Sequence, residues 1–123
     1  MLLMWGMKRQ IDPRELPGRD LVLRFDFRGL PKAHAARRYW WMILRPADVE
    51  VCLKDPGLDV DVVLASDLEA FVRVWMGHRG LDDALAEGDI TLSGEKAHIA
   101  ELKRALRIEN DANLKTLYFR PAA

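Results

Sequence analysis

The chain has 123 residues, of which 50% are hydrophobic and 31% are charged, and its 19 basic residues are balanced by 19 acidic ones. This length suits one domain with a sizeable core, and the charge balance argues against a broad basic face for non-specific nucleic-acid binding. The single cysteine, Cys52, excludes an intrachain disulfide and favours a reducing, cytoplasmic setting. No run of residues approaches the roughly 18 apolar positions of a membrane-spanning helix.

The first nineteen residues predict a short helical arm followed by a loop. Leu3 and Trp5 lie in an apolar stretch that ends near Gln10, and such a stretch either packs on the domain or contacts a partner. Two prolines and a glycine between residues 12 and 19 are typical of a loop. We therefore expect an arm and loop over residues 1–19, a domain over residues 20–108 and a C-terminal tail over residues 109–123.

Four strands are predicted in the first half of the domain. Residues 20–28 alternate, which places every second side chain, from Leu21 to Phe27, on one face of a sheet. Residues 37–45 are apolar on both faces, and residues 48–54 and 59–65 alternate again. Asp55-Pro56-Gly57 fits the turn between the last two.

The turns between these strands orient the second one. An even number of residues in each turn sets the pairs Leu44–Val49, Met42–Val51, Trp40–Leu53, Leu53–Val60 and Val51–Val62. Trp40, Met42 and Leu44 then share the face that the helices cover. Tyr39, Trp41 and Ile43 point to the other face of the sheet.

The segment from Ser66 to Gly94 predicts two helices and a fifth strand. Ser66 and Glu69 fit a capping box, after which apolar residues recur at helical spacing. Gly77 and Gly80 suit left-handed positions at a helix end, and residues 81–87 make a second, short helix that ends at Gly88. Residues 89–93 alternate as a strand, and residues 95–106 carry the apolar stripe of a last helix.

These elements predict an α+β fold, a five-stranded, largely antiparallel sheet with helices packed on one face. The sequence lacks the residue spacings that metal sites and catalytic sites require. His34, His78 and His98 stand apart from one another and from Cys52, which shows no sign of activation. Asp82 and Asp83 suit the first turn of a helix. We therefore predict no catalytic residue, no metal site and no cofactor, and hence no enzyme.

Three motifs in order resemble the second half of a sterol-carrier-protein-2 (SCP2)-like domain: Trp75-Met76-Gly77, the helix from Leu81 to Gly88, and the strand from Ile90 to Gly94. Residues 40–45 and 51–57 resemble the version found C-terminal to a winged-helix domain in HxlR-type bacterial transcriptional regulators. The resemblance covers roughly Asp20 to Leu106. It implies that this chain begins where the helix leaving the winged-helix domain ends.

The resemblance implies an apolar tunnel between sheet and helices that takes a lipid or another apolar small molecule. Methionine and aromatic walls suit such a cavity, because they adapt to varied apolar shapes. The candidate ligand-binding residues are Phe25, Phe27, Trp40, Met42, Phe71, Trp75, Met76 and Leu85. Residue types and spacing alone predict a solid core at the same positions.

A second candidate surface contains Trp5, Tyr39, Trp41 and Ile43. Either the N-terminal segment covers these strand residues, or they contact a second copy or another domain. The leading hypothesis is a non-enzymatic ligand-binding module, sensing or regulatory, that acts with a winged-helix partner or as a homodimer and does not itself bind nucleic acid. The alternative is a closed-core dimerisation domain without a ligand.

Overall fold

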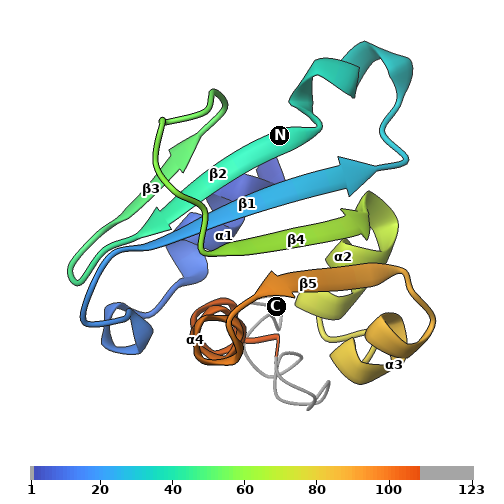
Figure 1. The fold of residues 1–123 in the computed structure, drawn as a ribbon. Helices are drawn as coiled ribbons and strands as arrows, with labels where there is room; N and C mark the ends of the chain where they lie inside the picture. The colour runs from blue at the N-terminus through green and yellow to red at the C-terminus, as the bar shows by residue number, and fades with distance from the viewer. Residues whose placement is uncertain (1, 109–123) are drawn as a thin grey trace, which may run out of the picture.

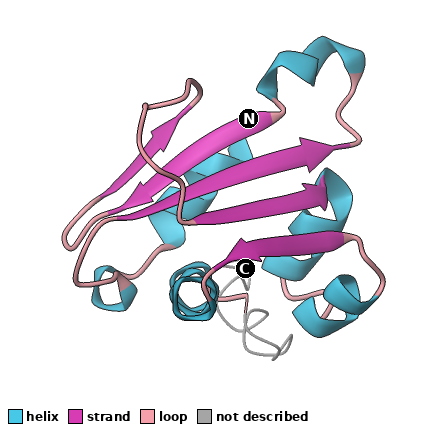
Figure 2. Ribbon diagram, in the orientation of Figure 1, coloured by secondary structure: helices cyan, strands magenta, loops and turns pink. Residues whose placement is uncertain are grey.

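The computed structural model describes residues 2–108, and a five-stranded mixed sheet stands at its centre (Figures 1 and 2). The strands are β1 (Leu21–Arg28), β2 (Tyr39–Leu44), β3 (Val49–Cys52), β4 (Val62–Asp67) and β5 (Ile90–Gly94). They lie in the order β3-β2-β1-β4-β5. β1 pairs in parallel with β4, and every other neighbouring pair is antiparallel.

The helices are α1 (Leu2–Gln10), α2 (Leu68–Trp75), α3 (Leu81–Ala86) and α4 (Lys96–Leu106), with short 3-10 turns at Pro13–Glu15 and Lys32–Arg37. Met4 of α1, Phe71 of α2 and Leu102 of α4 are all fully buried in one apolar cluster with the inner face of the sheet. This is the predicted α+β architecture with helices against one face. No helix among residues 2–108 has the length and hydrophobicity needed to cross a membrane.

β1 is the central strand of the sheet, and its alternating pattern places every second side chain in the core. Its inward side chains Leu21, Leu23, Phe25 and Phe27 are at most 1% exposed. On either side, Phe25 lies opposite Trp40 of β2 and Leu64 of β4. Burying a large apolar side chain stabilises a fold by about 2 kcal/mol before entropy is counted, so this row fixes which face of the sheet the helices cover.

The predicted register of the β2–β3 hairpin is confirmed, and the predicted pairing of β3 with β4 is wrong. Leu44 pairs with Val49 and Met42 with Val51, as the turn parity predicts, and the ladder ends at the Trp41–Cys52 pair. The pairs Leu53–Val60 and Val51–Val62 do not form, because β3 is an edge strand and Val62 pairs with Leu23 of β1. Turn parity sets a register only between strands that are neighbours.

The segment between β3 and β4, residues 53–61, therefore crosses the sheet instead of forming a tight hairpin. Figure 1 shows it passing over the face opposite α1. Two hydrogen bonds of 2.8 Å fasten its end: the Asp61 N–H donates to the Val22 carbonyl, and the Val22 N–H donates to the Asp61 carboxylate. β4 consequently begins at Val62 and not at residue 59.

The predicted capping box at Ser66 is also wrong. β4 continues to Asp67 because it pairs with β1 as far as Arg28. Ser66 is buried within that strand, and its hydroxyl donates to the Asp67 carbonyl at 2.7 Å. Asp67 is the N-cap residue of α2, and its side chain makes no capping hydrogen bond.

The glycines of the α2–α3 turn divide into two kinds. Gly77 has φ +80°, the left-handed conformation predicted for a helix end. Gly80 was expected to share it, but its φ is −72°, because it is the extended N-cap residue of α3. The predicted tail, residues 109–123, lies outside the described residues.

Candidate functional site

The apolar layer between the sheet and the helices is the largest candidate site. Three phenylalanine rings stand at its centre, with Phe25 and Phe27 on β1 and Phe71 on α2. Their ring centroids are 5.6–5.9 Å apart, and all three side chains are at most 1% exposed. Such offset and edge-to-face contacts stabilise aromatic clusters beyond simple area burial.

All eight residues proposed as ligand-binding from the sequence belong to this layer. Trp40 and Met42 point inward from β2, as the predicted register requires, and are at most 1% exposed. The Trp40 indole N–H donates to the Arg37 carbonyl at 2.8 Å, which satisfies its one polar atom. Trp75 is 8% exposed, whereas Met76 and Leu85 are partly buried and pack on the outside of the cluster.

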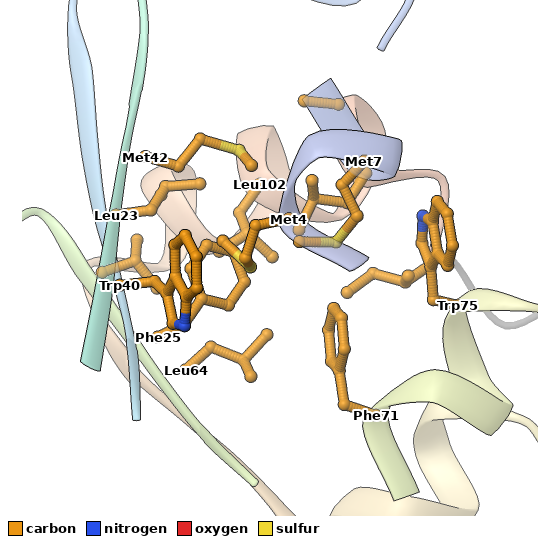
Figure 3. Close-up of a cluster of buried hydrophobic side chains, with 14 of the residues drawn as sticks. Met4, Met7, Leu23, Phe25, Trp40, Met42, Leu64, Phe71, Trp75 and Leu102 are labelled. Carbon is orange, nitrogen blue, oxygen red and sulfur yellow. The ribbon is translucent and has the colours of Figure 1, made fainter. Parts of the chain in front are cut away.

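Met4 and Met7 of α1 also belong to this layer, although neither was among the candidate ligand-binding residues drawn from the sequence. Both are fully buried in the same cluster. Figure 3 shows both side chains extending from α1 into the cluster, with Met4 pointing toward Trp40. The signal was present in the sequence, because Met4, Met7 and Ile11 stand at i, i+3 and i+7, one face of a helix.

α1 approaches α2 closely at a glycine. A Cβ atom placed on Gly6 would lie 3.6 Å from the far edge of the Trp75 ring, which is ordinary van der Waals contact. The indole of Trp75 thus lies against the backbone of α1. This contact, together with Met4 and Met7, makes α1 one wall of the apolar layer.

The opposite face of the sheet carries the second candidate surface. Tyr39 is 41% exposed, and two guanidinium groups lie near its ring, that of Arg38 at 5.2 Å and that of Arg24 at 6.0 Å from the ring centroid. Trp41 is half-buried, whereas Ile43 is only 1% exposed. Trp5 is 44% exposed, but it belongs to α1 on the other side of the sheet.

The N-terminal segment therefore does not cover the outer face, contrary to one of the two alternatives drawn from the sequence. The segment 53–61 crosses that face instead, and it leaves Leu53 and Leu58 about half exposed. A charged residue also lies on this face: Arg24 is part-buried, and its Nε atom has no hydrogen-bond partner within residues 2–108. Arg24 alternates along β1 with the inward Leu23 and Phe25, and its guanidinium lies near the Tyr39 ring on the face opposite the apolar layer.

Two surface hollows lie at the end of the sheet where β1 and β4 finish. The larger, about 310 Å³, is lined by charged residues including Arg73, Arg79 and Asp89. The smaller, about 240 Å³, is lined by Arg38, Leu30 and Phe27 among others. Arg28 and Gly29 line both. Because Phe27 is one of the three clustered phenylalanines, the smaller hollow reaches that aromatic cluster.

Among residues 2–108, the titratable groups show no arrangement typical of an active site. Burial, with the nearby Glu50 carboxylate, raises the pKa of the Cys52 thiol, which disfavours the reactive thiolate. His98 lies 3.9 Å from Asp61 and 3.8 Å from Glu95, beyond hydrogen-bond distance. Among residues 2–108 no group of three or more His, Cys, Asp or Glu side chains is placed to hold a metal ion.

No family model matches the chain, and no curated protein matches it in sequence. Solved structures match it in fold. The sec-alkylsulfatase Pisa1 from Pseudomonas sp. is 14% identical with a TM-score of 0.63, over 85% of this chain and 15% of the enzyme. The chain thus spans less than a sixth of the alkylsulfatase that it resembles.

Two smaller proteins match over nearly their whole length. The ubiquinone synthesis protein UbiJ-SCP2 is 15% identical with a TM-score of 0.58, over 98% of this chain and 95% of that one. Palmitated SCP2L2 from Aedes aegypti is 18% identical with a TM-score of 0.58, over 88% of this chain and 94% of that one. The chain therefore has the fold of sterol carrier protein 2 domains.

Proposed function

We propose that this domain binds a small apolar or amphipathic molecule, a lipid among the candidates, between the sheet and helices α1, α2 and α4. The observation that carries the proposal is the composition of that layer. Aromatic rings and four methionines, Met4, Met7, Met42 and Met76, come together there from separate elements. Methionine is unbranched and flexible, so such walls can repack around ligands of different shape.

The SCP2 fold supports the same proposal. One structure with this fold is described as palmitated, and others are named as sterol carrier proteins. A ligand that buried about 300 Å² of apolar surface would gain roughly 7 kcal/mol, from which the costs of association and ordering are subtracted. The eight candidate residues Phe25, Phe27, Trp40, Met42, Phe71, Trp75, Met76 and Leu85 would contact it.

We extend the proposal to the biological role. The resemblance of residues 40–45 and 51–57 to the domain of HxlR-type regulators favours a cytoplasmic sensing or regulatory module that catalyses no reaction. In that role ligand binding would act on a winged-helix partner or on a second copy of the chain. The activity of the whole alkylsulfatase is not carried over, because this chain matches only a small part of it.

A closed-core dimerisation domain is the second candidate, and a specific observation favours it. Most of the inward side chains are at most 1% exposed, as in a solid core, while Trp5 and Tyr39 remain exposed on the surface. Exposed aromatic residues are enriched in protein interfaces. The two candidates differ in whether the apolar layer takes up a ligand.

One substitution separates them. Ala105 is 1% exposed and faces the layer from α4, whereas Ala100 on the same helix is exposed. If the layer admits a ligand, Ala105→Phe fills it and weakens equilibrium binding of the neutral dye Nile red by roughly tenfold or more, while Ala100→Phe does not. If the core is closed, the wild type binds no dye, and Ala105→Phe destabilises the fold by about 1–3 kcal/mol in urea titrations.

A further inference from the structure

We propose that α1 is a lid on the apolar layer, and that Met4 and Met7 occupy the ligand's place when no ligand is bound. This inference rests on the proposed function and concerns how the same site is opened. Its first support is the depth of the two side chains. Both are fully buried between the sheet and α2, where they touch the region that the eight proposed ligand-binding residues line (Figure 3).

The second support is how α1 is held. Its polar side chains Lys8, Arg9 and Gln10 form no hydrogen bond or ion pair with any other part of residues 2–108; Lys8 instead lies over the ring of Trp5, one turn away on α1. Apolar contacts are therefore what hold the body of α1 in place. Such contacts are non-directional, so an apolar ligand can bury the same surface that α1 buries.

The third support is the contrast between the body of α1 and its C-terminal end. Just beyond α1, the Asp12 carboxylate accepts hydrogen bonds from Arg14 at 2.8 Å and from Arg107, at the end of α4, at 3.5 Å. A fixed end next to a body held by apolar contacts is the arrangement of a hinged lid. Gly6 weakens the middle of the helix further, since glycine is a poor helix former.

Ligand uptake should consequently be limited by the opening of α1. In stopped-flow mixing with Nile red, the observed rate should rise with dye concentration and then reach a plateau equal to the opening rate. Met7→Ala removes a buried anchor of the lid, and the plateau should increase by roughly thirtyfold, the factor that corresponds to about 2 kcal/mol. Ile90→Ala is the matched control, a fully buried residue on β5 at the opposite edge of the sheet from β3.

Hydrogen exchange provides a readout that needs no ligand. The amides of residues 7–11 should exchange at least a hundredfold faster than those of β1, and Met7→Ala should accelerate only the former. Amides in α1 that exchange as slowly as those in β1, or an equal plateau for Met7→Ala and Ile90→Ala, overturn the lid. An absence of dye binding in every variant, with α1 amides still exchanging fast, overturns the proposed function and leaves the opening of α1 established.

Discussion

Phe71 is the residue through which α2 joins the aromatic centre of the sheet. Its ring meets Phe25 edge-on at 5.9 Å and Phe27 at 5.6 Å, and its side chain is fully buried. It was identified from the sequence because apolar residues recur at helical spacing from Leu68 onward. Its contacts with Phe25 and Phe27 of β1 could not be predicted from the sequence.

Phe71→Ala should lower the free energy of unfolding by about 3–5 kcal/mol, because it leaves a cavity at the meeting point of the three rings. Urea unfolding followed by circular dichroism measures this change. Leu58→Ala is the control, since Leu58 is 44% exposed and its removal should change stability by less than about 0.5 kcal/mol. Equal effects of the two substitutions would show that Phe71 is not part of a packed centre.

Asp12 makes the stability of the folded state depend on pH in the acidic range. Hydrogen bonds from the Arg14 side chain, and then from the Arg14 backbone N–H, lower the pKa of Asp12 from 3.8 to about 2. Because the folded state holds the carboxylate more strongly than the unfolded chain, the stabilisation is complete above about pH 4 and is lost as the pH falls toward about 2.

The carboxyl carbon of Asp12 should therefore titrate with a midpoint near 2 by nuclear magnetic resonance. In Asp12→Asn the loss of stability between about pH 4 and about pH 2 should be smaller than in the wild type, as urea titrations at each pH would report. A midpoint close to the ordinary value of 3.8 would mean that the contact with Arg14 is not kept in solution.

Among the elements, those fixed by local pattern were predictable and those fixed by distant partners were not. The strands β1 and β2 and the helices α2 and α3 were found within about two residues, since alternation and helical spacing are local signals. The place of β4 beside β1 was missed, because nothing in residues 53–61 tells a tight turn from a crossover. For the same reason the start of β4 was predicted at residue 59 instead of Val62, and Ser66 was wrongly predicted to cap α2.

The role of α1 was missed for a different reason. The sequence favoured Leu3 and Trp5 as the residues that would cover the outer face of the sheet. The buried stripe is instead Met4, Met7 and Ile11. Spacing along a helix decides which side faces a core, and hydrophobicity of single residues does not.

Gly94, at the end of β5, lies so close to the backbone at Asp61 and Val62 that no other residue fits there. Gly94 has φ +150°, and a Cβ atom on it would clash with the backbone carbonyl of Asp61. Gly94→Ala should therefore cost more than about 2 kcal/mol. At Gly88, with φ +76° and open space around it, Gly88→Ala should cost only about 1 kcal/mol of backbone strain. Thermal or urea unfolding compares the two, and a tolerated Gly94→Ala would contradict the observed contact.

At the scale of the whole molecule, the SCP2-like fold was recognisable from the order of three short motifs between Trp75 and Gly94. Six of the eight candidate residues are buried in one cluster, and Met76 and Leu85 pack against it, because alternation on β1 and β2 and helical spacing on α2 and α3 fix their faces. That Met4, Met7 and Ile11 of the N-terminal segment join the same layer was seen only in the structure. This makes the apolar layer both the core of the fold and, in our proposal, the place of the ligand.

Native mass spectrometry of the purified chain, followed by denaturation and extraction, tests that proposal most directly. The account predicts an added mass of an apolar small molecule that disappears on denaturation, and that Ala105→Phe reduces more than Ala100→Phe. A clean mass for the chain alone, together with no uptake of Nile red at equilibrium, would contradict it and would turn attention to Tyr39 and Trp41 as an assembly surface.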